Sequence, residues 1–391
     1  MLNPRSSLTL TAVSAGTQEA AINTYQTMDQ SILVSDGDYL NLDPRRENNS
    51  DEMNGKEEPD VIYDNGSLAS GNFNFGKLQP NQAAFLLAFG LGACATTAAG
   101  SGYLHTITPI DGDIDIARSN PSFTAGQRVG KTINKRRLAS CFIDSLSLSF
   151  AADDWVKGSG SVKATGMHED TVIEETVTAL DNVTSITLAA NAVQGATAED
   201  RLDSVQVVRA VVGGGYVFAN VTAVSAATPA EITFDSMGGA GASVDYKVLY
   251  TPTEPAWATF PARITETPMR VSQACLHLGG AWDGSAFVGG SAVAATLQQF
   301  EYNLNNNLNI EFTFCAGGAF AGRAFRQGRN QTINLTRNMR NMLMQRYMDS
   351  NEYFGLHLLC EGAEFDTGHK YSLELIFPRL GLLAAPISSG N

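Results

Sequence analysis

Charged residues are scarce in this 391-residue chain, at 17% of the total, and basic residues are scarcer than acidic ones. The 26 Lys and Arg against 40 Asp and Glu give a formal net charge of −14. Domains that bind nucleic acid tightly are usually basic, because neutralising phosphates supplies most of their affinity. Tight nucleic-acid binding is therefore not expected. The low charged fraction indicates a surface that is partly covered by other protein. The negative net charge is explained either by repulsion of DNA that passes the protein or by ordinary solubility.

The five cysteines and five histidines follow no spacing that binds metal or supports catalysis. Without a CxxC pair, zinc ribbons and disulfide frameworks are not expected, whereas buried and reduced thiols are. No HxxxH, HExxH, GxSxG or P-loop motif occurs in the sequence. We therefore expect no metal, no cofactor and no enzymatic activity.

Two short segments imitate ligand-binding motifs. GLGACA (90–95) fits a loose dinucleotide fingerprint, but the fingerprint needs a strand before it, and here a predicted helix comes first. DGDID (111–115) imitates the start of a calcium loop, yet Ile116 stands where that loop needs Gly and Ser122 where it needs Glu. Neither segment is interpreted as a site.

Long hydrophobic runs are also lacking. The longest, near residues 83–95, is interrupted by Gly90 and Gly92 and is too short to span a bilayer. Residues 1–16 have no basic start followed by an apolar core, so no signal peptide and no membrane partner are expected.

What the sequence does have is glycine, at 37 residues, and many short alternating segments, which together favour strands joined by turns. Within 141–150, apolar and serine residues alternate, which predicts a strand with one buried face. The apolar positions are Leu146, Leu148 and Phe150, and the serines are Ser145, Ser147 and Ser149. The segment 158–167 follows a turn and is expected to pair with this strand as a hairpin.

Helices are expected at three places. Residues 80–95 have Pro80 in the first turn, an apolar face and an ending at Gly90 and Gly92. Residues 335–348 have apolar side chains at helical spacing, with Thr336 as the cap. Residues 19–28 form a possible short helix. Longer strands are expected at 269–280, 297–314, 353–362 and 371–380.

The chain divides into three parts. Residues 169–252 contain strand candidates at intervals of about ten residues, which is typical of a small β-sandwich-like module. This insertion separates a first core part, 1–168, from a second, 253–391. The proline-rich segment 251–255 marks its exit.

Two blocks of charge are prominent. Residues 36–66 are rich in Asp, Glu, Asn, Gly and Pro and predict a long irregular acidic loop, either disordered or ordered by a partner. Residues 323–346 contain six arginines and no acid. The two blocks form either two halves of one interface, in which opposite charges fix the register, or two independent solvated surfaces.

Several stretches, taken in order, resemble the major tail tube proteins of tailed bacteriophages. The first half of the likeness lies in 16–42, in the helix of 78–97 and in YLHTITP (103–109). The most specific stretch is SCFIDSLSLSFAADDWVKGSGSVKATG (140–166), which matches a long hairpin of that family. The likeness continues in 268–284, LNNNLNIEFTF (304–314) and IFPRL (376–380), and leaves out 169–252.

The resemblance implies a mainly β fold of two packed sheets with a flanking helix. In that family six subunits form a ring whose strands join into one continuous β-barrel, and the rings stack into a hollow tube. Double-stranded DNA and the tape-measure protein occupy the lumen, and other tail proteins are further partners. The protein is then made in the host cytoplasm and resides in the virion tail, where an acidic tube lets DNA slide. The insertion is expected outside the tube, which favours a non-contractile tail.

The residue-level predictions follow from the alternation and the charge blocks. The serine face of 141–150, with Ser145, Ser147 and Ser149, is expected to line the lumen. Acidic residues of one subunit are expected to meet arginines of the next. The acidic set is Asp51, Glu52, Glu57 and Glu58, and the basic set is Arg337, Arg340 and Arg346.

Other functions stay open. A capsid decoration or neck protein has the same β-rich composition but forms discrete rings or binds a shell. A carbohydrate-binding adhesin is the other alternative, with Trp155, Trp257 and Trp282 as residues that stack on sugars or anchor the core.

Overall fold

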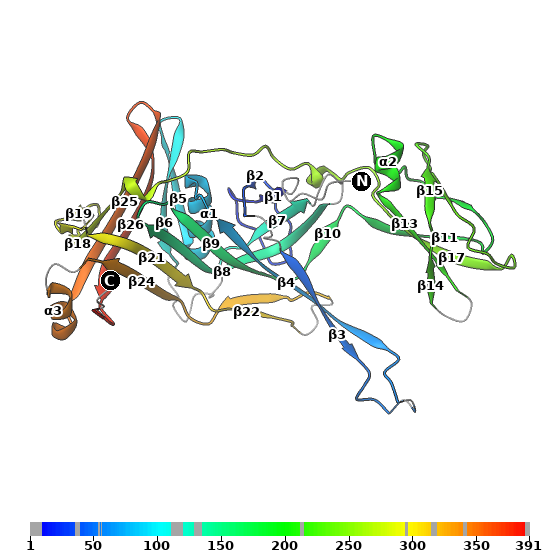
Figure 1. Cartoon of the computed structure of the whole chain (residues 1–391), viewed down its shortest axis with the longest axis horizontal. Coiled ribbons are helices and arrows are strands. Elements are labelled where there is room, and N and C mark those ends of the chain that lie inside the picture. The colour runs from blue at the N-terminus through cyan, green and yellow to red at the C-terminus, as the bar shows by residue number, and fades with distance from the viewer. Residues whose placement is uncertain are drawn as a thin grey trace.

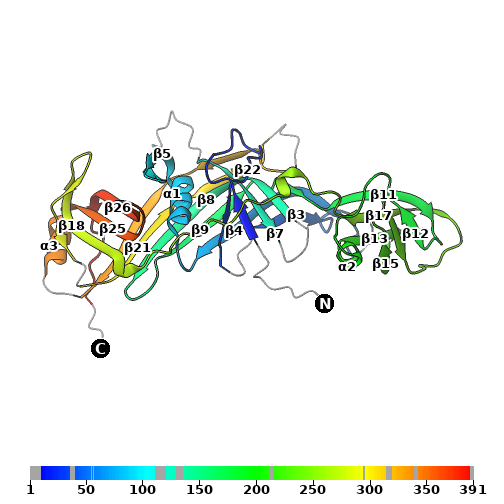
Figure 2. The same cartoon turned by 90° about the horizontal axis from the view of Figure 1, so that it is seen from above.

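The computed structural model describes residues 10–35, 40–53, 55, 57–110, 120–128, 135–211, 215–293, 296–313, 319–338 and 342–387. This part of the chain is mainly β, as expected, and its long axis runs from a small β module at one end to helix α3 at the other (Figures 1 and 2). A large sheet occupies the centre and carries the surface described below as the candidate site.

Among the described residues, ten strands form the large sheet, in the order β2-β1-β7-β8-β9-β4-β3, with β10, β21 and β24 joined through β8 and its neighbours. Strand β8 has 17 residues, so its first half pairs with β7 and its second half with β21. The strands are β1 (Leu10–Val13), β2 (Gln30–Ile32), β3 (Asn41–Asn48), β4 (Ile62–Phe75), β7 (Phe123–Arg128), β8 (Lys135–Ala151), β9 (Lys157–Ala164), β10 (His168–Asp170), β21 (Leu297–Asn305) and β24 (Asn330–Arg337).

A second sheet shares the main core with the large one. Leu276, Leu358 and Leu375 of this sheet are buried with Phe300 and Tyr302 of β21 in one hydrophobic cluster. Its strands are β18 (Ala274–Trp282), β19 (Phe287–Val288), β20 (Ser291–Ala292), β25 (Tyr353–Asp366) and β26 (His369–Gly381). Two separate hairpins are β5 (Gly92–Ala99) with β6 (Gly102–Pro109) and β22 (Leu308–Glu311) with β23 (Arg323–Arg326).

Helix α1 (Pro80–Leu91) flanks the large sheet and begins at the predicted residue. The side chains of Gln79 and Gln82 form a capping box, and Pro80 takes the first helical position, where its missing N–H is not needed. The helix ends at Leu91, which confirms the ending predicted at Gly90 and Gly92, because Gly92 adopts a left-handed φ of 102° and starts β5. Since the helix precedes the strand, GLGACA has the opposite order to a dinucleotide-binding turn.

The close approach of α1 to the sheet depends on two glycines in β9. A Cβ at Gly158 would lie 2.8 Å from Leu78, and a Cβ at Gly160 would lie 2.8 Å from Leu86. The Gly-Ser-Gly-Ser pattern of β9 therefore places glycine under the helix and serine on the opposite face. The hairpin of β8 and β9 was predicted from the sequence and is confirmed.

Residues 173–250 form two small sheets around a hydrophobic core of their own. Phe234 of one sheet packs on Tyr246 of the other, with ring centroids 5.7 Å apart. The first sheet has the order β11-β17-β13-β14 and the second β12-β16-β15. The elements are β11 (Ile173–Leu180), β12 (Ser185–Thr187), α2 (Ala198–Leu202), β13 (Val205–Ala210), β14 (Tyr216–Phe218), β15 (Val221–Val224), β16 (Glu231–Phe234) and β17 (Ser243–Tyr250). We call this part the module.

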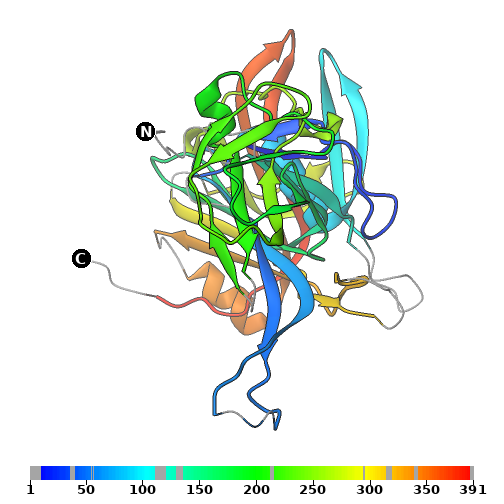
Figure 3. The same ribbon diagram turned by 90° about the vertical axis from the view of Figure 1, so that its right-hand side faces the viewer.

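The prediction of an irregular loop over 36–66 is wrong at both ends of the described part, where residues 41–48 and 62–66 are strand, whereas residues 49–53, 55 and 57–61 between them are in no strand. Strands β3 and β4 pair in antiparallel fashion and project from the body as a hairpin, which we call the arm (residues 41–68; Figures 1 and 3). Pro44 is tolerated because β3 is an edge strand, and the register shifts between Pro44 and Arg46. Residues 36–39, 54 and 56 of the predicted loop lie outside the described residues.

The predicted helix over 335–348 is also partly wrong. Residues up to Arg337 belong to β24, and Thr336 pairs with Gln299 instead of capping a helix. The helix, α3 (Leu343–Ser350), is shorter. The segment 330–337 contains both exposed and half-buried side chains. Its pairing with β21 makes it a strand, although residues 335–337 begin a segment with helical periodicity, because tertiary contacts outweigh local helical preference.

Three smaller expectations also change. Residues 19–28 contain one turn and otherwise irregular backbone, not a helix. Glu19 is buried among Ser122, Thr124 and Ser140, whose groups donate hydrogen bonds to its carboxylate. The strand expected over 297–314 is interrupted between β21 and β22, where Asn307 has a φ of 47°. The strand expected over 269–280 begins only at β18, after the 3-10 turns η2 (Ala256–Ala258) and η3 (Val271–Gln273).

The cysteines agree only in part with the expectation of buried thiols. Cys141 and Cys360 are buried, and burial raises the pKa of Cys360 to about 11. Cys94 and Cys275 are exposed, because they lie on solvent-facing positions of β5 and β18. Cys315 and the segment 111–115 lie outside the described residues.

Candidate functional site

One face of the large sheet is lined by short polar side chains from five neighbouring strands. Residues that pair directly across antiparallel strands point to the same face. Two complete rows therefore cross the sheet from β24 through β21, β8 and β9 to β4. The rows are Thr332, Asn303, Ser147, Ser159, Asn74 and Asn330, Asn305, Ser145, Ser161, Asn72. We call this surface the polar face.

Charge on the polar face is sparse and balanced. The next row contains Asn334, Glu301, Ser149 and Lys157, so that it has one acid and one base. Lys157 also pairs with Asp154, with its Nζ 2.6 Å from the carboxylate. The Ser147 hydroxyl donates to Glu301 at 3.3 Å. The surface therefore offers many weak hydrogen-bonding groups and no cluster of positive charge among these rows.

The opposite face of the same strands is apolar and fully covered. Leu146, Leu148 and Phe150 of β8 have exposures of 3%, 0% and 2%, which confirms the predicted buried face. The serines between them are half-buried. Among the described residues, α1 and the second sheet pack on the apolar side, and the serine side keeps half-buried, solvent-accessible side chains.

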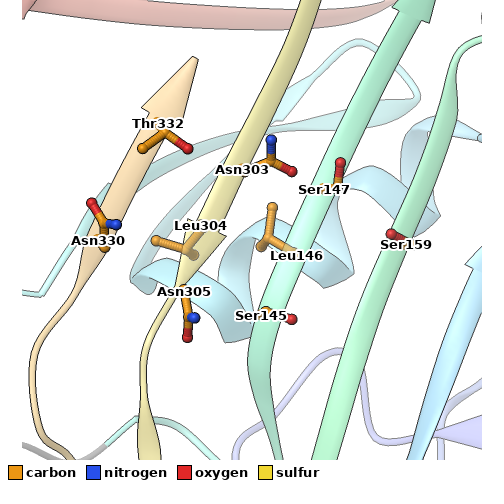
Figure 4. A pocket seen from close by; sticks show the side chains of 9 residues that line it. All are labelled: Ser145, Leu146, Ser147, Ser159, Asn303, Leu304, Asn305, Asn330 and Thr332. Carbon is orange, nitrogen blue, oxygen red and sulfur yellow. The ribbon is translucent and has the colours of Figure 1, made fainter. Parts of the chain in front are cut away.

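The polar face has two shallow depressions that share Ser147 and Ser159. Figure 4 shows the first, with side chains from β24, β21, β8 and β9 in front and α1 behind the sheet. The second extends toward Ser35, Asn74 and Lys157. Within the described part of the chain, no group of three His, Cys, Asp or Glu side chains could hold a metal ion.

The predicted acidic residues lie together at the far end of the arm. Asp51, Glu52, Glu57 and Glu58 are all exposed. The Tyr63 hydroxyl donates to Glu52 at 2.9 Å, and this hydrogen bond raises the pKa of Tyr63. The tip of the arm therefore presents a dense negative charge to solvent.

The arginine-rich stretch is not one continuous surface, in contrast to the prediction. Arg329 points inward and donates to the backbone oxygens of Leu91 (3.0 Å) and Ile110 (3.1 Å), and Arg326 is buried. Arg346 is exposed on α3 and Arg337 is half-buried at the end of β24. Arg340 lies outside the described residues.

The arm and α3 project from opposite ends of the core in Figure 1, so the acidic tip does not meet the described arginines of the basic set, Arg337 and Arg346, within one chain. Any pairing between them requires a second copy. The sequence indicated both sets from charge alone, but not that they lie so far apart.

Two of the three tryptophans have structural partners. Trp155 is stacked by Arg270 at 4.8 Å and approached by Lys77 at 5.6 Å. Trp257 is stacked by Arg137 at 4.8 Å, and its Nε1 donates to Glu169 at 2.8 Å. Trp282 is 36% exposed at the end of β18. The three do not form a shared surface for stacking on sugars.

Sequence reasoning missed the polar residues that extend the serine face. Asn303, Asn305 and Thr332 come from strands far along the chain, and Ser159 lies in the next strand. The alternation in LQQFEYNLN (297–305), with its buried Phe300, Tyr302 and Leu304, was the available signal. Which strand it pairs with is not encoded in that pattern.

Comparisons with protein-family models and with curated proteins find no match to this chain. No helix in the described ranges is long and apolar enough to cross a membrane.

Proposed function

We propose that this protein is the structural subunit of a phage tail tube, in which rings of copies stack into a hollow conduit for DNA. The observation that carries the proposal is the polar face, which is open, nearly neutral and built from Ser, Asn and Thr. A conduit wall must let a polyanion slide, so it needs wetted groups without a positive cluster that would hold phosphates. The polar face meets this requirement across five strands.

The edges of the sheet support the same proposal. Among the described strands, β24 pairs only with β21 and β3 only with β4. Unpaired edges template association with other chains unless they are covered. Pairing such edges between copies would close the sheets into a barrel with the polar face inside.

Stacking between rings is proposed to use the arm. The acidic tip, with Asp51, Glu52, Glu57 and Glu58, would meet Arg337, Arg340 and Arg346 of an adjacent copy. Opposite charges at such a contact steer encounter and fix register while adding little net energy, because exposed ion pairs contribute about 0–1 kcal/mol each. The contact would therefore be sensitive to salt.

The module is proposed to lie outside the tube. Its separate core means that it does not depend on the large sheet for burial of its apolar side chains. Figure 2 shows it at the end of the molecule away from α3, connected by the segments that flank residues 173–250.

Negative-stain microscopy of the purified full chain, concentrated at near-physiological salt, tests the proposal. Hollow tubes or stacked rings are the expected result. Discrete rings that never stack would favour a neck or decoration protein instead. A persistent monomer at every concentration would reject the tube assignment.

A further inference from the structure

The module presents two exposed aromatic rings next to each other on edge strand β14. Tyr216 is 56% exposed and Phe218 is 67% exposed, and neither belongs to the hydrophobic core of the module. Since they are two residues apart in one strand, their side chains share a face and stand about 7 Å apart. Contiguous exposed apolar surface marks interaction sites, whereas singly exposed apolar residues are normal.

The register places both rings on the outer face of the four-stranded sheet. Phe218 pairs with Val208, which pairs with Lys247, which pairs with Thr176, so these four side chains form one row. The alternate positions Val207, Tyr246 and Val248 are buried in the module core. The row therefore faces away from the core, toward solvent.

Polar groups on β17 and β11 share this outer face with the two rings. The Lys247 ammonium lies 5.6 Å from the Tyr216 ring centroid and 3.1 Å from the Glu174 carboxylate. Asp245 accepts a hydrogen bond from Thr178 at 2.7 Å, and both are exposed. Hydroxyl, carboxylate and ammonium groups thus lie on the same face of the sheet as the aromatic pair.

The net charge of the module and the side chains near the rings limit the class of ligand that this surface can bind. Between residues 173 and 250 there are three basic and nine acidic residues, so the formal charge is 3 − 9 = −6. Nucleic acids and other polyanions are therefore disfavoured. A protein partner would need a broad continuous apolar patch at the centre of the contact. Here the apolar strip is narrow, because Val208 and Ala210 of β13 adjoin the rings and the charged Lys247 and Asp245 stand on the next strand, β17. A neutral sugar polymer satisfies both constraints, because its C–H faces stack on aromatic rings and its hydroxyls hydrogen-bond to the polar groups.

We propose that Tyr216 and Phe218 form a platform for a neutral polysaccharide, with Lys247, Asp245 and Thr176 as hydrogen-bonding groups on the same outer face, on strands β17 and β11. This platform does not depend on the tube assignment. If copies of the chain do assemble into an array, repetition would raise the avidity of a weak site by about 10²- to 10⁴-fold.

Affinity electrophoresis of the full chain in native gels tests the platform. The gels contain dextran, laminarin, galactomannan or hydroxyethyl cellulose as neutral polymers, and alginate as the acidic one. The platform variant carries Tyr216→Ala and Phe218→Ala. The control variant is Tyr103→Ala, which removes an aromatic ring of 70% exposure from β6, away from the module.

The expected result is retardation of the native protein and of Tyr103→Ala by at least one neutral polymer, with no retardation by alginate. The platform variant should lose the retardation completely while keeping its circular dichroism spectrum and melting temperature. Absence of retardation in every neutral gel overturns the proposal. Equal retardation of the platform variant and the native protein also overturns it. A change in the oligomeric state of the platform variant, in gels with and without polysaccharide alike, overturns it as well, because the rings would then belong to a contact between copies of the chain.

Discussion

Replacing Gly160 with valine tests whether α1 and the polar face are built on one tightly packed strand. In β9 the glycines face α1 and the serines face the opposite side. A Cβ at Gly160 would lie 2.8 Å from a Leu86 methyl group and 3.7 Å from Ile143, so a branched side chain has no space. Overpacking of this kind typically costs about 1–3 kcal/mol in the free energy of unfolding.

Gly76→Val is the matched control, because Gly76 is exposed, has nothing within 4 Å of an added Cβ and has no positive φ. We expect this variant to change stability by about 0.5 kcal/mol or less. Urea unfolding followed by tryptophan fluorescence reports on the core selectively, since Trp155, Trp257 and Trp282 all lie outside the module. Equal unfolding midpoints for the two variants would refute the close packing of α1 on β9.

Three further predictions concern buried charge, pH and assembly. Glu19→Ala removes the acceptor of hydrogen bonds from Ser122, Thr124 and Ser140 and should cost about 3–5 kcal/mol in urea unfolding; a loss below 1 kcal/mol would contradict a satisfied buried carboxylate. The pKa of Asp366 is lowered by backbone N–H groups of Thr367 and Ser101, so its contribution to stability exists above the unfolded pKa and disappears as pH falls through the folded pKa. The difference in melting temperature between native protein and Asp366→Asn should therefore shrink between pH 5 and pH 3, and a constant difference would count against it. Charge reversal by Arg346→Glu should weaken assembly, measured by sedimentation at low salt, and Glu58→Arg in the same chain should restore it; normal assembly of the single variant would exclude the pairing.

The local features of the fold were predictable from sequence where alternation and turn chemistry agree. The alternation of Leu146, Leu148 and Phe150 with serines identified the buried face of β8, and Pro80 identified the start of α1. Both signals are local: the first is the spacing of apolar side chains along one strand, and the second is the missing N–H of Pro80, which suits the first turn of a helix.

The elements that sequence reasoning missed depend on distant partners. Residues 335–337 begin the segment 335–348, which has helical periodicity, yet β21 supplies them with a strand partner that periodicity cannot show. The arm forms although Pro44 interrupts it, because an edge strand does not need that N–H. The serine face was predictable, but its continuation into Asn303 and Asn305 depends on the pairing of β21 with β8, across more than a hundred residues.

Electron cryo-microscopy of assembled particles tests most directly whether the polar face lines a lumen. The account predicts a tube in which Ser147, Ser159 and Asn303 face the central channel, α1 lies outside the inner wall and the module lies on the exterior. A reconstruction that places α1 or the module against the channel, with the polar face buried between copies or turned outward, would contradict it.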